Sequence, residues 1–302
     1  MGSPYSGPPM PPVPPPTYVD SSGGVQVAVH HLGGPDQPDA PVLLLSHATG
    51  FHGRAWAPLA SHLTDRYRCL AIDHRGHGVA RTPEGASFDW AVIADDTVAV
   101  LDSALVPEDA ELHGAGHSMG GAMLVLAAAR RPGRFASLWL FEPIVAPPTT
   151  RLGQGPNPMA DAARRRRSTF ESLDAALANY ASKPPLDELH PDALAAYVDG
   201  GFEVQPDGTA VLRCRPDWEA ATFDGAGGSG AWDVLGAVDV PVAVLAGRPE
   251  AAGPAAFAPH VAEALPAGTL VPHPELGHFG PLEAPGELAE ELASMLVRQA
   301  PA

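Results

Sequence analysis

The feature that most constrains this chain is Ser118, which lies in the segment GHSMGG at residues 116–121. Glycines stand two residues before and two residues after it, a strand-like run precedes it, and the helix-forming run AMLVLAAAR follows at 122–130. A sharp turn from strand to helix strains the serine backbone and requires small residues at those flanking positions. The pattern predicts a nucleophile elbow that exposes the Ser118 hydroxyl and directs the amide of Met119 towards an oxyanion.

Continuous apolar runs alternate with helical patterns along the rest of the chain. The apolar runs, typical of buried parallel strands, are 41–45, 69–72, 138–141 and 241–246. The helical patterns with the clearest periodicity are 95–105, 122–131 and 285–297. Partial alternation over 25–31 predicts an antiparallel strand at one edge. The sequence therefore predicts an α/β fold, with a mostly parallel sheet flanked by helices.

Composition and rhythm divide the 302 residues into three parts. Residues 1–20 form a Pro-rich tail that we expect to be disordered. Residues 21–145 and 237–302 carry the strand and helix alternation of the core. Residues 146–236 lose the strand rhythm and are predicted to form an inserted helical cap, or lid, over the site.

Two expectations concern side chains of this cap. Its apolar residues Phe170, Tyr180 and Trp232 should cover the site and set specificity. The basic run 164–167 is interpreted as a solvated helix face whose charge is balanced by Asp161 and Glu171, with a grip on an anionic substrate as the alternative.

Charge and cysteine content exclude several classes of function. The chain has 35 acidic and 18 basic residues and a formal charge of −17, which argues against binding to nucleic acid or to an anionic membrane surface. Its two cysteines, Cys69 and Cys214, are too few for a disulfide framework or a zinc knuckle, so no metal is expected. Without a signal peptide or a long apolar run, the Ala/Gly/Pro-rich chain is predicted to be a bacterial, cytoplasmic protein.

A serine nucleophile needs a base and a second oxyanion donor. His278, in the segment PELGHFGPLEAP before the C-terminal helix, is the candidate base. Most other histidines, His30 among them, are expected at the surface. The segment LLLSHATGFHG at 43–53 runs from an apolar strand into a loop of small residues, and Thr49 is the candidate donor, with Ala48 or Gly50 as alternatives.

Four of these segments together resemble the α/β-hydrolase fold superfamily. They are SHATGFHG, AIDHRGHG, GHSMGG and GHFGPLEAP, and they follow one another in the order of that superfamily. The resemblance implies an eight-stranded sheet, a helical cap, a catalytic triad with an oxyanion hole, and no cofactor.

The position of the catalytic acid is left open between two glutamates. In the superfamily the acid commonly follows the seventh strand, where VAVLAGRPE offers Glu250. In the haloalkane dehalogenase branch it follows the sixth strand, where LWLFEPIVAP offers Glu142. We favour Glu142, because a carboxylate that ends a buried strand needs a partner for its charge.

The function predicted from these residues is serine hydrolysis of a carboxylic ester, lactone or related acyl bond through an acyl-enzyme. Ser118 is the nucleophile, His278 the base and Glu142 the acid, with Met119 and Thr49 as oxyanion donors. The expected partner is a small, apolar acyl substrate, and a homodimer is compatible with the sequence. The alternatives are a non-catalytic small-molecule binding or sensor protein, a cofactor-free haloperoxidase or perhydrolase, and an acyltransferase.

Overall fold

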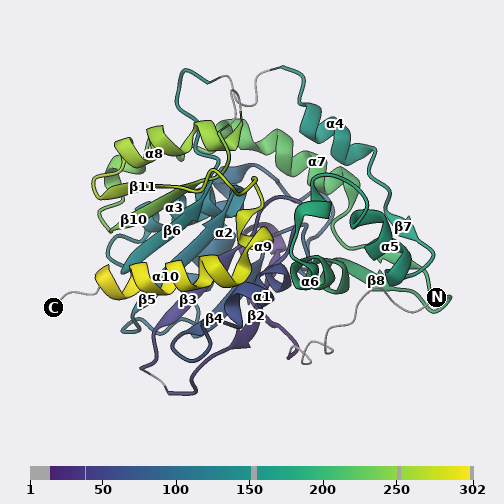
Figure 1. The fold of residues 1–302 in the computed structure, drawn as a ribbon, viewed down its shortest axis with the longest axis horizontal. Helices are drawn as coiled ribbons and strands as arrows, with labels where there is room; N and C mark the ends of the chain where they lie inside the picture. Colours follow the sequence, from purple (N-terminus) through teal and green to yellow (C-terminus); the bar gives the residue numbers. More distant parts are fainter. Residues whose placement is uncertain (1–13, 38, 151–154, 250–252, 300–302) are drawn as a thin grey trace.

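The computed structural model describes residues 14–37, 39–150, 155–249 and 253–299. An eight-stranded sheet with the order β1-β2-β4-β3-β5-β6-β10-β11 forms its centre (Figure 1). Strands β1 and β2 pair antiparallel with their neighbours, and the other adjacent strands pair parallel. The strands are Thr17–Asp20 (β1), Gln26–Gly33 (β2), Val42–Ser46 (β3), Arg68–Asp73 (β4), Leu112–His117 (β5), Ser137–Phe141 (β6), Val242–Ala246 (β10) and Gly268–Pro272 (β11).

Helices cover both faces of this sheet, which confirms the predicted fold class. Alternate residues of each central strand face opposite sides, so that Leu44 and Leu43 belong to two different apolar clusters. One cluster packs against α2, α3 and α8, and the other packs against α1 and α10. The helices of the two faces are Trp90–Leu101 (α2), Met119–Arg130 (α3), Ala258–Ala264 (α8), Ala57–Ala60 (α1) and Pro285–Gln299 (α10).

The predicted disordered tail is too long at its C-terminal end. Residues Thr17–Asp20 form β1, which pairs antiparallel with β2. The sequence of β1, TYVD, contains three β-formers but is short and follows a proline-rich stretch, so its strand character is easily missed. Residues 1–13 lie outside the described part of the chain.

Most elements of the chain between β6 and β10 lie together at one side of the molecule (Figure 1). Besides helices it contains a small antiparallel sheet with the order β7-β9-β8. The prediction of a helical cap did not include this sheet. A turn at 205–208 connects strands β8 and β9 into a hairpin, where Gln205 N donates to Thr209 O. The elements are Pro158–Arg164 (α4), Thr169–Phe170 (β7), Leu173–Tyr180 (α5), Pro191–Gly201 (α6), Phe202–Val204 (β8), Ala210–Leu212 (β9) and Pro216–Asp224 (α7).

The end of this insertion belongs to the core. Trp232 packs against the cluster beneath α2, α3 and α8, whereas Phe170 and Tyr180 lie in a cluster with Phe51 of the core and Leu282. The expectation that Trp232 covers the site is therefore wrong. Within the described residues, no helix combines the length and apolar character needed to cross a membrane.

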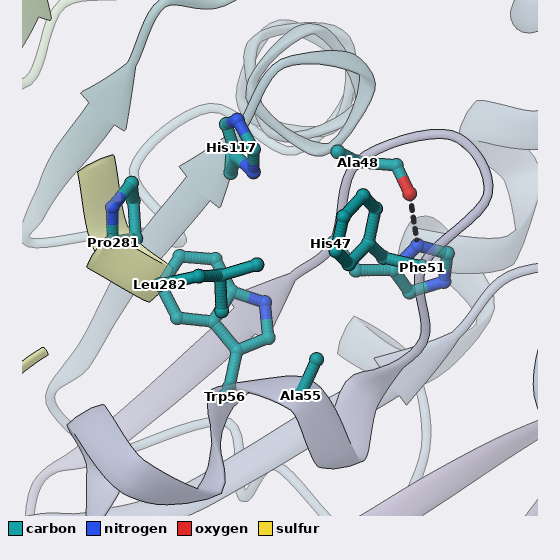
Figure 2. A pocket seen from close by; sticks show the side chains of 8 residues that line it. All are labelled: His47, Ala48, Phe51, Ala55, Trp56, His117, Pro281 and Leu282. Atoms are coloured by element: carbon teal, nitrogen blue, oxygen red, sulfur yellow. Dashed lines mark hydrogen bonds between the residues drawn. The ribbon is translucent and has the colours of Figure 1, made fainter. Parts of the chain in front are cut away.

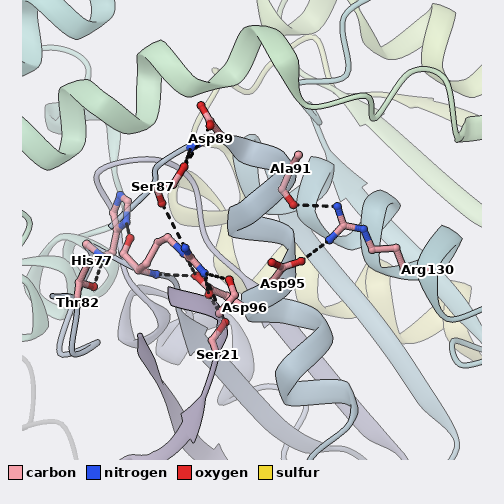
Figure 3. Close-up of polar contacts among 12 residues, drawn as sticks. Ser21, His77, Thr82, Ser87, Asp89, Ala91, Asp95, Asp96 and Arg130 are labelled. Atoms are coloured by element: carbon pink, nitrogen blue, oxygen red, sulfur yellow. Dashed lines mark hydrogen bonds and ion pairs between the residues drawn. The ribbon is translucent and has the colours of Figure 1, made fainter. Parts of the chain in front are cut away.

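A buried ion pair fixes the end of β4 to α2. Arg75 donates to both carboxylate oxygens of Asp96 through Nη2 (2.6 Å) and Nε (3.0 Å), and its backbone N adds a third bond at 3.0 Å. Ser21, in the turn after β1, donates to the same carboxylate at 2.6 Å. Figure 3 shows this network around Asp96, which ties the N-terminal hairpin to the core.

We expect Arg75→Met to lower the free energy of unfolding by about 3–5 kcal/mol, because it leaves the Asp96 carboxylate buried without its cation. Arg131→Met is the matched control, since Arg131 pairs with Asp102 at the surface, where such a pair contributes about 0–1 kcal/mol. Urea unfolding of both variants measures the difference. Equal losses would show that the buried pair does not stabilise the fold in this way.

Candidate active site

The turn from β5 to α3 has the geometry of a nucleophile elbow. Ser118 has φ 55° and ψ −116°, and its backbone N donates to Phe141 O at 3.0 Å. A Cβ at Gly116 would lie 2.8 Å from Gly121 Cα, and one at Gly120 would collide with the carbonyl of Ser46. The two flanking glycines are thus required by close approach of the backbone. The strained turn leaves Ser118 8% exposed.

The strand register brings the ends of the neighbouring strands β5 and β6 to the same edge of the sheet. His117 is paired with Phe141, and Phe141 is paired with Leu245. The next residues along these strands, Ser118 and Glu142, therefore end neighbouring strands at one edge. Among the described residues other than glycine, these two have positive φ, 55° and 43°.

Glu142 contacts His278 directly. The Nδ1 of His278 donates to Glu142 Oε2 at 2.6 Å, and the other carboxylate oxygen accepts from Gly247 N at 2.7 Å. Glu142 is 2% exposed, so both of its oxygens are satisfied by these donors away from solvent. A Cβ at Gly247 would lie 2.8 Å from both Glu142 Oε1 and Gly277 O. Only glycine fits where the acid and the His278 loop meet.

Because Nδ1 of His278 carries the shared proton, its Nε2 is left with a lone pair, as a base requires. In the described part of the chain, no hydrogen bond joins Ser118 Oγ to His278, although such bonds commonly tighten only when substrate binds. Glu250, the alternative acid, lies outside the described residues.

The candidate oxyanion loop follows β3, and hydrogen bonds of the His47 side chain hold its first residues. His47 donates from Nδ1 to Ala48 O at 2.8 Å and accepts at Nε2 from His74 N at 3.2 Å, which defines a neutral tautomer. Burial, together with the neighbouring histidines, lowers the pKa of His47 well below its usual range. The Thr49 hydroxyl contacts Met119 Sδ at 3.4 Å. The two predicted oxyanion residues are therefore neighbours.

A hollow lies between the oxyanion loop and the segment after His278 (Figure 2). His117, the residue before Ser118, points into it together with side chains of the loop and of Gly280–Glu283 (α9). Aromatic and aliphatic groups dominate its walls. The lining residues are His47, Ala48, Phe51, Ala55, Trp56, His117, Pro281 and Leu282.

An aromatic ring of the insertion packs on the rings of the oxyanion loop. Tyr197 of α6 packs on Phe51 with ring centroids 4.8 Å apart, and it stacks on His52 at 5.9 Å. The Nε2 of His52 is also hydrogen bonded to Tyr197 O at 3.0 Å. Phe51 in turn packs on Phe279, which follows His278, at 5.2 Å. The insertion thus covers the loop that precedes the elbow.

The basic run of the insertion is only partly a solvated face. Arg164 pairs with Asp161 at 3.0 Å as expected, but Arg166 is half-buried and binds both oxygens of Glu219 at 2.8 and 2.9 Å. Burial alone would lower the pKa of Arg166, but Tyr197 and Glu219 beside it raise it well above its usual range. A Cβ at Gly50 would collide with Glu219 Oε1. The expectation for this run is therefore wrong at Arg166, whose partner Glu219 is 53 residues away.

Sequence reasoning also misplaced one histidine. His30 is buried, where it is hydrogen bonded to Asp73 at 2.9 Å. Asp73 accepts from Gly53 N at 2.6 Å and so supports the far end of the oxyanion loop. The alternation gave no signal for this burial, because it places His30 on the same face as Gln26, opposite Val25, Val27 and Val29.

Comparison with known proteins agrees with this architecture. A 2-(acetamidomethylene)succinate hydrolase of Mesorhizobium japonicum is 29% identical over 54% of this chain and 68% of its own length. The magnesium-chelatase 30 kDa subunit of Rhodobacter capsulatus is 28% identical over 77% of this chain and 78% of its own. A crystal structure of E-2-(acetamidomethylene)succinate hydrolase shares the fold with a TM-score of 0.76 at 22% identity, over 93% of this chain and 98% of that one. The model of the alpha/beta hydrolase family matches residues 42–291, and the chain belongs to this family of enzymes.

Proposed function

We propose that the protein is a serine hydrolase that cleaves a carboxylic ester, lactone or related acyl bond through an acyl-enzyme. The observation that carries this proposal is the bond between His278 Nδ1 and Glu142 Oε2, on the sheet edge where Ser118 forms a strained elbow. An imidazole with its Nδ1 proton fixed by a carboxylate presents Nε2 as the general base.

The proposed reaction has two steps. His278 takes the proton of Ser118 as the hydroxyl attacks the carbonyl carbon, and the backbone amides of Met119 and Thr49 stabilise the oxyanion. His278 then protonates the leaving alcohol or amine. In the second step a water molecule, activated by the same imidazole, releases the acid and restores Ser118.

The proposed substrate is a small molecule with a short, apolar acyl group. The hollow beside His117 is narrow and is walled by rings and aliphatic side chains such as Trp56 and Leu282. Such walls favour a short apolar group. The net charge of −17 gives no attraction for nucleic acid or anionic lipid.

The proposal is tested by mixing the protein with p-nitrophenyl acetate and with longer acyl esters. We expect turnover to fall as the acyl chain lengthens, because the hollow is small. Acid quenching followed by mass spectrometry should detect the acyl group on the peptide that contains Ser118. Turnover with an acyl adduct on another residue would contradict the assigned nucleophile, and the absence of both turnover and adduct across esters, lactones and amides would contradict the hydrolase.

A binding protein on the same fold is the second candidate. It is favoured by the similarity to a magnesium-chelatase subunit, whose name denotes a component of an assembly rather than a hydrolase. A binder would take up an apolar ligand with equal affinity before and after Ser118→Ala and would form no adduct. Ligand binding by calorimetry on both forms distinguishes the two functions.

A further inference from the structure

The loop that carries His278 contains three consecutive residues whose backbone is held by side chains. Glu283, the last residue of α9, accepts from Gly277 N with Oε2 at 2.7 Å and from Phe279 N with Oε1 at 3.2 Å. One half-buried carboxylate therefore binds the amides on both sides of His278.

His117 is hydrogen bonded to the backbone of His278, which lies between these two amides. Its Nε2 lies 2.7 Å from His278 O, and since a carbonyl oxygen only accepts, the imidazole is the donor. Burial lowers the pKa of His117 well below its usual range, and His278 beside it lowers it further, so the ring stays neutral. The two imidazole centroids are 4.8 Å apart. His117 is thus fixed against the base by packing and by a hydrogen bond.

These contacts matter because residues 277–279 belong to neither a strand nor a helix. The carbonyls of Gly277 and Phe279 accept backbone bonds from the start of α9, but no sheet or helix bond fixes the amides of these residues. The position of the imidazole therefore depends in part on the side-chain contacts of the loop. A displacement of about 1 Å at a reacting group can lower a rate by about 10²-fold. The Glu142 bond sets the direction of the imidazole, whereas Glu283 and His117 set the position of the backbone that carries it.

We infer that Glu283 and His117 are positioning residues for the catalytic base, and that together they hold the backbone of residues 277–279. The inference rests on the proposed function, because it assigns roles in the same reaction. Neither residue touches the substrate carbonyl in this scheme, and each acts through His278.

A pH effect follows from the surroundings of Glu283. Burial raises the pKa of its carboxyl, Glu188 raises it further, and the Gly277 amide and Arg248 oppose this rise. Protonation on acidification removes an acceptor for one of the two amides. Acidification should therefore lower the rate of the wild type in part through Glu283. Glu283→Gln, which lacks this carboxyl, should show a shallower acid limb.

The test uses the full chain and four single variants. Glu283→Gln retains one acceptor oxygen but turns an amino group towards the other amide, and His117→Phe keeps a ring but loses the donor. His117→Gln keeps a donor, and Glu287→Gln removes an exposed carboxylate four residues along as the matched control. We expect kcat to fall about 10²-fold in the first two variants, with KM changed far less. His117→Gln should recover most of the loss, and Glu287→Gln should behave as the wild type.

A second readout does not depend on turnover. The proton in the short bond from His278 Nδ1 to Glu142 gives a far-downfield proton NMR signal, which is assigned by its absence in His278→Gln. This signal should shift or broaden in Glu283→Gln and His117→Phe but not in Glu287→Gln. If both variants fold with the wild-type melting temperature and retain the wild-type signal, the positioning role is wrong. If Ser118→Ala leaves activity unchanged, the proposed reaction through Ser118 fails, while the NMR signal still decides the positioning.

Discussion

Ser118→Ala is expected to lower kcat for an ester substrate by at least about 10⁴-fold while leaving KM and the unfolding midpoint close to those of the wild type. In the proposed reaction the Ser118 hydroxyl forms the acyl bond, and the residues on either side of it, His117 and Met119, carry no hydroxyl. The oxyanion donors are backbone amides, which the substitution leaves in place, so a slow residual rate over water should remain. Steady-state kinetics with a p-nitrophenyl ester measure the loss.

A fluorophosphonate probe gives an independent measure of the same residue. It should label the wild type and fail to label Ser118→Ala, because it reacts only with an activated serine hydroxyl. Ser46→Ala is a suitable control and should be labelled like the wild type. Ser46 ends the neighbouring β3, and its hydroxyl is buried and hydrogen bonded to His74 at 2.8 Å. An alanine variant that kept near-native turnover or labelling would exclude Ser118 as the nucleophile.

Glu142→Gln is expected to lower kcat by about 10⁴-fold. The carboxylate accepts from two donors, His278 Nδ1 and Gly247 N. A glutamine has one acceptor oxygen and one amino group, so it can satisfy only one of these donors. The backbone amide of Gly247 cannot change its role, and it therefore selects the oxygen and leaves the amino group facing His278. The imidazole must then carry its proton on Nε2, the nitrogen that should receive the proton of Ser118.

Glu250→Gln is the matched control for this prediction, because Glu250 is the other strand-end glutamate that the sequence offers. We expect it to change kcat by less than about tenfold, because His278 Nδ1 already has Glu142 as its acceptor. The ratio of the two kcat values decides between the acids. A larger loss in Glu250→Gln would reverse the assignment and leave the nucleophile and base untouched.

Much of the fold could be predicted because the central strands are buried on both faces. Strands β3, β4, β6 and β10 are continuous apolar runs that stand out from the polar connections. β11 could not be found in this way. It lies at the edge of the sheet with Leu270 40% exposed, so burial does not constrain its residues. The strands of the insertion are two or three residues long and carry no measurable period.

The candidate site could likewise be predicted only where a local sequence pattern indicates its residues. Ser118, Glu142 and His278 could be named because each follows a recognisable strand or precedes a recognisable helix. Arg166 was misjudged because its partner, Glu219, comes from a helix 53 residues away, and no local pattern indicates such a pair. The contacts of Glu283 and His117 with the loop of His278 likewise depend on how separate segments fold against each other.

The positive φ angles of Ser118 and Glu142 have a consequence for engineering the protein. Such a conformation costs about 1–3 kcal/mol for a residue with a side chain, and a glycine would relieve part of that cost. Substitutions chosen only for thermal tolerance should therefore favour replacement at the two positions whose side chains the proposed reaction requires. Selection for thermal stability and selection for turnover would then favour different residues at these two positions.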